Sequence, residues 1–284
     1  MRYLLFATRR EAAPHSHSHS KHVNYCDLNR HRLWKRRVWV FGHQFQAPSL
    51  DRLASLWMHK LGILGRFEMQ LLRELVCPGM TVVDVGANQG IYTLTLAGLA
   101  RPGRVFAFEP EPMLFRQLVA NVQENKADNV VCHPVAISRQ AGRLSLQAGK
   151  MHSGNNRIVQ QPRSDSIEVA AATLDELFAD KVVDFLKIDV QGWEAEALAG
   201  AKEVLQRNRD IILMCEFWPY GLRSAGTEPA EMLRFLGSVG FSLRRIKQGK
   251  LVQLDLRALP DPSRKLAYWD LIGTRDPRVL GPGA

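Results

Sequence analysis

Between residues 81 and 217 the sequence alternates short apolar runs with longer amphipathic stretches, and this alternation restricts the fold more than any other feature. The apolar runs have the length and composition of buried strands; they are TVVDV (81–85), RVFAFEP (104–110), NVVCHPVAI (129–137), VDFLKIDV (183–190) and DIILMCEF (210–217). Helical patterns such as EPMLFRQLVANVQEN lie between them. Strands that alternate with helices are typical of a mainly parallel sheet covered on both faces. We therefore predict an α/β fold with a doubly wound sheet.

The flanking segments predict additions to this sheet. RLSLQ and SIEVAAA have the pattern of edge or extra strands, and the segment after the last helix has the pattern of a hairpin followed by a final strand, YWDLIGT. Before the first strand, apolar residues at helical spacing predict a helical cap. The expected organisation is a basic extension at 1–40, a helical cap at 41–76, the main domain at 77–276 and a tail at 277–284.

The positive charge of the chain is concentrated near its N-terminus. The net charge is +10, and residues 1–40 contain nine lysines and arginines against only Glu11 and Asp27. A basic arm of this kind can contact RNA or a membrane surface. The alternative is a disordered, solvated tail, which the low-complexity HSHSHSKH tract at 15–22 favours. The main domain is therefore near neutral, and we do not expect nucleic acid as its partner.

The composition predicts a cytoplasmic protein without a membrane span. No apolar run reaches the length of a transmembrane helix, and MRYLLFATRR becomes charged too early for a secretory signal. The four cysteines are scattered without a C-x-x-C pair, so we expect neither structural zinc nor disulfides.

Four acids stand at or near the ends of predicted strands: Asp84, Glu109, Asp189 and Glu216. Ligands of such sheets bind beyond the carboxyl ends of the strands. Asp84 is followed by a turn with Gly86, Ala87, Asn88 and Gly90. A dinucleotide fingerprint requires glycine where this chain has Asn88, so a ligand without a diphosphate fits better.

S-adenosylmethionine is such a ligand. Its carboxylate can bind at a helix N-terminus, its ammonium seeks a carboxylate, and its ribose diol seeks an acid at the next strand end. Asp84 and Glu109 are the candidates for the last two roles. We predict a cofactor site made of Asp84, Gly86, Ala87, Asn88, Gly90 and Glu109. The alternative is that the glycines only form a tight turn between strand and helix.

Several motifs in order resemble the FkbM family of methyltransferases: MTVVDVGANQGIYTLTLA, VFAFEPEPMLFRQLVANVQEN, TLDEL, VDFLKIDVQGWEAEALAGA and ILMCEFWPYGLRSAG. The resemblance covers roughly residues 65–245. It implies a class I, Rossmann-like methyltransferase fold, S-adenosylmethionine as donor and O-methylation of a sugar, polyketide or similar hydroxyl. The family commonly has D-V-E-G where this chain has Asp189-Val190-Gln191-Gly192, so a charge role of that glutamate is in question here.

The methyl acceptor needs a group that removes its proton. Asp189 is the first candidate, as base or as an anchor for the acceptor, although it could instead cap the following helix. Glu216 and His152 are the other candidates, whereas Lys187 and Glu68 fit ion-paired or solvent-facing roles. Asp189 and Glu216 alone are thin evidence for a metal, and none is predicted. The segment FWPYGL (217–222) offers aromatic faces to a sugar or planar acceptor, or packs as an apolar wall.

The leading hypothesis is an S-adenosylmethionine-dependent O-methyltransferase that acts on a small molecule or glycan. Its rivals are an RNA methyltransferase anchored by the basic arm, a nicotinamide-dependent oxidoreductase and a cofactor-binding scaffold without turnover. The missing middle glycine argues against the oxidoreductase.

Overall fold

The computed structural model describes residues 37–47, 55–56, 58, 61, 65–147, 149 and 156–280. Most of the predicted N-terminal extension, part of the predicted helical cap, His152 and the last four residues of the tail lie outside these ranges. Within them, no helix is long and apolar enough to cross a membrane.

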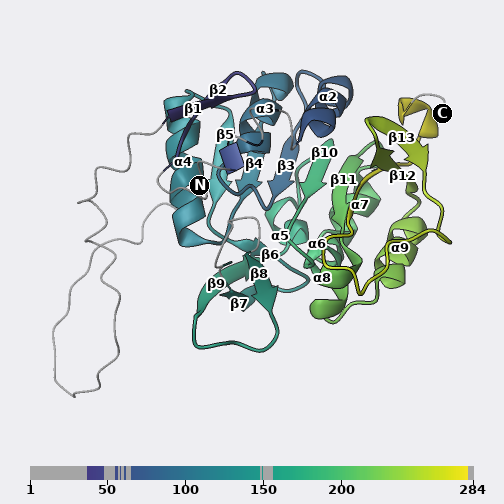
Figure 1. The fold of residues 1–284 in the computed structure, drawn as a ribbon. Coiled ribbons are helices and arrows are strands. Elements are labelled where there is room, and N and C mark those ends of the chain that lie inside the picture. Colours follow the sequence, from purple (N-terminus) through teal and green to yellow (C-terminus); the bar gives the residue numbers. More distant parts are fainter. Residues whose placement is uncertain are drawn as a thin grey trace, which may run out of the picture. The chain divides into compact units, whose positions relative to one another are not determined.

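An eight-stranded sheet forms the centre of the fold, in the order β13-β12-β14-β11-β10-β3-β4-β5 (Figure 1). Five adjacent strands are parallel, and β14, β12 and β13 extend the sheet by antiparallel pairing. The strands are β3 (Val82–Val85), β4 (Val105–Phe108), β5 (Val130–His133), β10 (Phe185–Ile188), β11 (Ile212–Phe217), β12 (Ser242–Lys247), β13 (Lys250–Gln253) and β14 (Trp269–Thr274). This is the doubly wound, mainly parallel α/β sheet predicted from the sequence, with antiparallel additions at one edge.

Helices cover both faces because the strands are apolar on both sides. One hydrophobic cluster joins the sheet to α2 (Arg66–Leu75), α3 (Ile91–Ala100) and α4 (Pro112–Glu124). A second cluster joins the other face to α5 (Leu174–Leu177), α6 (Glu194–Ala199), α7 (Lys202–Arg207), α8 (Pro219–Ser224) and α9 (Pro229–Ser238). A short 3-10 helix, η4 (Pro277–Leu280), follows β14.

A second sheet forms where the sequence predicted one strand and some edge additions. Its order is β6-β9-β7-β8, with β6 (Ala136–Ile137), β7 (Gly142–Gln147), β8 (Arg157–Val159) and β9 (Ser166–Ala172). The run NVVCHPVAI is therefore not a single strand, because it divides at Pro134 between β5 of the large sheet and β6 of the small one. A proline has no N–H to continue a ladder, which explains the break.

A hairpin, β1 (Arg37–Val40) and β2 (His43–Gln46), replaces the expected junction between extension and helical cap. The turn has positive φ at Phe41 and Gly42, as a tight hairpin turn requires. Its second strand packs on α4, whose Asn121 and Asn125 accept hydrogen bonds from backbone amides of β2. Asn121 also donates to the carbonyl of Gln89, 2.8 Å away, so the hairpin is joined to the turn after β3.

Candidate functional site

A cavity of about 240 Å³ lies at the carboxyl ends of β3, β4 and β10. Strand β3 stands between β4 and β10, so the strand order reverses at this point. This is the position at which open α/β sheets bind ligands. The segments that follow the three strands bring Gly86, Glu109 and Asp189 into one wall.

The turn after β3 is held by close backbone packing. The N–H groups of Gly86 and Ala87 both donate to the carbonyl of Phe108 at 3.0 Å. Gly86 has φ +82°, and a β-carbon there would collide with the carbonyl oxygen of Asp189. Gly90, at φ +93°, begins α3 and would bring a β-carbon within 2.8 Å of Leu118. Gly86 is therefore required both by its positive φ and by the backbone that follows β10, whereas Gly90 is required mainly by its positive φ.

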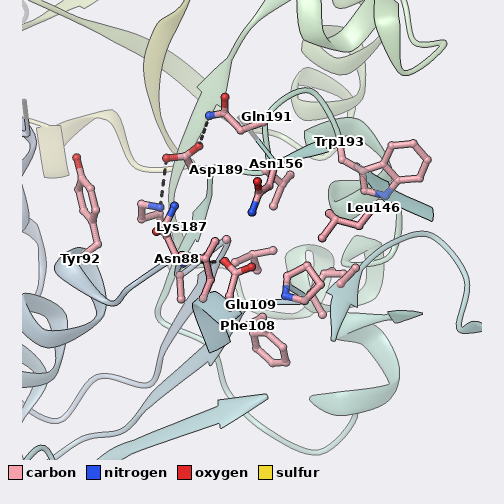
Figure 2. A pocket seen from close by; sticks show the side chains of 18 of the residues that line it. Asn88, Tyr92, Phe108, Glu109, Leu146, Asn156, Lys187, Asp189, Gln191 and Trp193 are labelled. Atoms are coloured by element: carbon pink, nitrogen blue, oxygen red, sulfur yellow. Dashed lines mark hydrogen bonds and ion pairs between the residues drawn. The ribbon is translucent and has the colours of Figure 1, made fainter. Parts of the chain in front are cut away.

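Glu109 lies in the cavity wall with its carboxylate fixed by the backbone. One oxygen accepts from the N–H of Asn88 at 2.8 Å, and the other accepts from the N–H of Glu111 at 2.9 Å (Figure 2). Asn88 itself has φ +52°, and this turn directs its N–H toward Glu109. A buried carboxylate thus lies at the second strand end, where the sequence analysis expected an acceptor for a ribose diol.

The wall beside Glu109 is apolar, and the second sheet contributes Ile137, Leu146 and Ile158 to it. Trp193 contributes to it, and its indole N–H donates to the hydroxyl of Ser138 at 3.3 Å. The other apolar side chains of this wall are Phe108, Leu114, Val135, Ile137, Leu146 and Ile158. Sequence reasoning missed Ile137, Leu146 and Ile158 because their strands form a separate sheet that it did not predict. The one available signal was Pro134, which interrupts the third apolar run.

Asp84 lies beside the cavity and is not one of its lining residues. Its carboxylate is fully buried, accepts a hydrogen bond from the Thr93 hydroxyl at 2.7 Å and pairs with the Lys187 ammonium at 3.4 Å. The expectation that Asp84 binds the cofactor directly stays a prediction, and in the structure its carboxylate lies outside the cavity lining. Residues 84 and 187 are register partners on β3 and β10, and this pairing occupies the carboxylate.

Lys187 is a buried ammonium that does line the cavity. Burial favours its neutral amine, but the Asp84 and Asp189 carboxylates outweigh this effect and raise the pKa of Lys187 above its ordinary value. The ammonium lies 3.7 Å from Asp189 and 4.7 Å from the ring centroid of Tyr92. Lys187 is therefore a fixed positive charge, in agreement with the ion-paired role expected for it.

Asp189 and Gln191 stand at the polar end of the cavity (Figure 2). The Gln191 amide donates to Asp189 at 3.0 Å and reaches the two Glu216 oxygens at 3.3 and 3.4 Å. The Asp189 side chain is 37% exposed, whereas Glu216 is buried and does not line the cavity. The structure thus brings together two of the three predicted catalytic residues; His152 lies outside the described part of the chain.

Burial favours the protonated form of other carboxyls in this region. It raises the pKa of Glu216 well above its usual range, and nearby Asp189 adds to the effect. Burial also raises the pKa of Asp270, the β14 residue opposite Glu216, to about 7, with a further contribution from Glu68. Glu68 of α2 is half-buried and close enough to Asp270 to raise its pKa. Within the described ranges, no three His, Cys, Asp or Glu side chains are grouped to hold a metal ion.

Comparison with known proteins gives a family match over most of this region. Residues 84–243 match the model of the methyltransferase FkbM domain. The chain is 28% identical over 198 residues to the 2-O-methyltransferase NoeI of Sinorhizobium fredii, covering 62% of this chain and 74% of that protein.

Two further curated relatives match shorter parts of the chain. One is the 31-O-demethyl-FK506 methyltransferase FkbM of Streptomyces tacrolimicus, 30% identical over 159 residues, which are 44% of this chain and 61% of that protein. The other is the hexuronic acid methyltransferase AglP of Haloferax volcanii, 26% identical over 162 residues, or 56% of this chain and 62% of that protein.

Proposed function

Since the chain belongs to the FkbM methyltransferase family and is an S-adenosylmethionine-dependent methyltransferase, we propose that it methylates a hydroxyl of a sugar, glycan, polyketide or similar small molecule. The observation that carries the proposal is that Glu109 and Asp189 lie in the same cavity. One is fixed beside an apolar wall, and the other stands at a polar end with an adjacent cation. The end with Glu109 suits the nucleoside part of the donor, and the end with Asp189 suits the hydroxyl of the acceptor.

The residues of the cavity fit the donor. The apolar wall formed by Phe108, Leu146, Trp193 and their neighbours suits an adenine ring. Glu109, whose carboxylate is held by two backbone amides, is placed to accept hydrogen bonds from a ribose diol. The N-terminus of α3 begins at the edge of the cavity, where backbone amides and the helix dipole favour a carboxylate. When bound, S-adenosylmethionine supplies an electrophilic methyl group.

Asp189 is the group that we assign to the acceptor. A neutral hydroxyl is a poor nucleophile, and a carboxylate within hydrogen-bond reach accepts its proton as attack proceeds. Asp189 is the more exposed of the two predicted carboxyls, and Lys187 and Gln191 hold it on two sides. Glu216 carries a raised pKa, which suits a hydrogen-bond donor rather than a base. We therefore assign Asp189 as the base or as the anchor of the acceptor, and we assign Glu216 a supporting role as a hydrogen-bonding neighbour.

The relatives favour oxygen as the acceptor atom. NoeI is named as a 2-O-methyltransferase, and the Streptomyces enzyme acts on 31-O-demethyl-FK506. Because these acceptors differ, the family match supports hydroxyl methylation and leaves the choice of acceptor to the residues around the polar end of the cavity.

The test has two separate parts. Calorimetric titration with S-adenosylhomocysteine measures donor-site binding, and methyl transfer from labelled donor to a panel of sugars, glycolipids and polyketides measures the reaction. We expect Asp189→Asn to keep the affinity for S-adenosylhomocysteine and to lose transfer by about a hundredfold or more, the usual effect of removing a general base. Unchanged transfer by Asp189→Asn would contradict the assigned role.

A further inference from the structure

Next to the polar end of the cavity are two aromatic rings, and a cationic side chain lies over each ring. Trp218 and Tyr220, at the start of α8, have ring centroids 5.6 Å apart, and we call this pair the aromatic shelf. The Arg157 guanidinium lies 5.8 Å from the centroid of Trp218, and the Lys265 ammonium lies 5.6 Å from that of Tyr220. The Trp218 indole N–H donates to the Lys265 carbonyl at 2.9 Å, which ties the two segments together.

The aromatic shelf is joined to the cavity by backbone packing. Gly192, which directly follows cavity-lining Gln191, lies so close to Gly221 that a β-carbon on it would collide with the backbone there. A β-carbon on Gly221 would in turn collide with the indole ring of Trp218. On the other side, Asn156 lines the cavity and is the immediate neighbour of Arg157. The shelf therefore adjoins the end of the cavity that contains Asp189.

The two cations of the shelf lack a carboxylate partner among the described residues. Other surface arginines do have one, for example Arg143 with Glu168 at 2.8 Å and Arg139 with Glu196 at 2.7 Å. No ion pair links the side chain of Arg157 or Lys265 to any acid that the structure describes. The six residues at 150–155, which lie shortly before Arg157, contain a lysine and a histidine but no acid.

Arg157 is also only partly exposed, and its guanidinium lies over an indole ring, which limits the positions that it can adopt. Guanidinium groups pair in a two-pronged manner with carboxylate, sulfate-like and phosphate oxygens, and pre-positioning reduces the entropy lost on binding. Positive charge without an acidic partner among the described residues, next to the cavity, is therefore a recognition element for a negative group. Aromatic faces next to it can pack against the apolar face of a sugar ring.

We propose that the aromatic shelf, Arg157 and Lys265 form an acceptor subsite for an anionic sugar, whose negative group contacts the two cations while its hydroxyl reaches Asp189. The proposal rests on the proposed function, because it concerns the acceptor of that same reaction. It adds a chemical class: a sugar that carries a carboxylate, a sulfate or a phosphate.

The experiment is a calorimetric titration of the full-length chain loaded with S-adenosylhomocysteine. The probes are methyl glucuronide, glucose 6-sulfate and glucose 6-phosphate, which separate the three negative groups, and neutral methyl glucoside. We expect at least one anionic probe to bind about tenfold more tightly than the neutral one, and its affinity to fall as salt is added. Arg157→Gln is expected to abolish the preference.

Two further variants complete the design. Lys265→Gln, an exposed substitution, is expected to weaken the same probe and covers the case in which Arg157→Gln does not fold. Arg143→Gln removes an exposed arginine from the neighbouring strand β7 and is expected to leave the preference unchanged. Thermal melting and S-adenosylhomocysteine binding verify that each variant is folded.

The inference is overturned if neutral and anionic probes bind equally, if no anionic probe binds at millimolar concentration, or if both shelf variants bind like the wild type. Failure of the proposed function would give a different result in the methyl-transfer assay. In that case no sugar or other hydroxyl compound accepts a labelled methyl group, whatever the binding preference of the loaded protein.

Discussion

The side-chain amide of Gln191 lies 3.0 Å from the Asp189 carboxylate and 3.3 Å from that of Glu216, so one amide group bridges two carboxyls from adjacent strands. Gln191 adopts φ +55°, a left-handed conformation that is uncommon for a residue with a side chain. The FkbM family commonly has glutamate at this position. In this chain a glutamate would place a third carboxylate against two others.

The first prediction concerns Gln191→Glu. An added negative charge disfavours ionisation of the neighbouring carboxyls, so we expect methyl transfer to require higher pH and kcat at pH 7 to fall by about tenfold. Measuring kcat against pH with an acceptor from the panel tests this. Gln191→Ala is the matched control: it removes the amide without adding charge, so it should lower kcat with a smaller displacement of the profile. Identical profiles for Gln191→Glu and the wild type would show that the bridge does not influence the reaction.

The second prediction concerns Asp270 and the stability of the protein. Burial raises the pKa of Asp270 to about 7 in the folded chain, against 3.8 for the ordinary residue. An acid whose pKa is raised by folding contributes its full stabilisation below the pKa of the unfolded chain, 3.8. This stabilisation is lost as the pH rises through the folded pKa of about 7. Asp270→Asn has no proton to lose. We therefore expect the variant to be more stable than the wild type at pH 8 by roughly 2 kcal/mol or more, with a smaller difference at pH 5.

Urea unfolding at the two pH values measures this difference. Asp180→Asn changes an exposed carboxylate after α5 and serves as control, with no expected pH-dependent gain. An Asp270→Asn variant whose advantage is the same at pH 5 and pH 8 would show that Asp270 does not hold a proton in the folded protein.

The sequence predicts the large sheet well because each strand and its terminal acid are encoded locally. Glu109 and Asp189 follow apolar runs of strand length, and parallel strands must end at the same edge. The capping pattern at Thr173 is local too, and its hydroxyl accepts from the Glu176 N–H at 3.1 Å as the motif requires.

The remaining features depend on contacts between distant residues. The sequence predicts that Asp84 binds a ligand. In the structure its carboxylate instead forms an ion pair with Lys187, its partner across β3 and β10, which lies 103 positions further along the chain. The division at Pro134 decides that Ile137 joins a second sheet and reaches the cavity, and no periodicity within the run signals this. Such pairings follow from tertiary packing, which a single sequence does not display.

The third prediction is that Glu109→Gln weakens binding of S-adenosylhomocysteine by about tenfold to a hundredfold. An amide retains one acceptor oxygen, so it cannot both accept from the two backbone N–H groups and bind a diol. Isothermal titration calorimetry measures the loss. Glu111→Gln is a matched control in the same segment, because Glu111 only caps α4 through the Met113 and Leu114 N–H groups. That variant should lose about 1 kcal/mol of stability or less and keep its affinity; equal losses of affinity in both variants would contradict the role given to Glu109.

The fourth prediction separates two glycines of the same region. At Gly86, φ is +82° and a β-carbon would collide with the Asp189 carbonyl, so Gly86→Ala must strain the turn and displace the end of β10. We expect a loss of roughly 2–4 kcal/mol in the free energy of unfolding together with weaker S-adenosylhomocysteine binding. Gly98 lies within α3 with open space around its α-carbon, so Gly98→Ala should be neutral or stabilise the helix by up to about 1 kcal/mol. Denaturant titration of the two variants compares them directly. Equal midpoints would contradict both the left-handed backbone at Gly86 and the close approach of the Asp189 carbonyl, because these two features make alanine costly at residue 86 and are absent at residue 98.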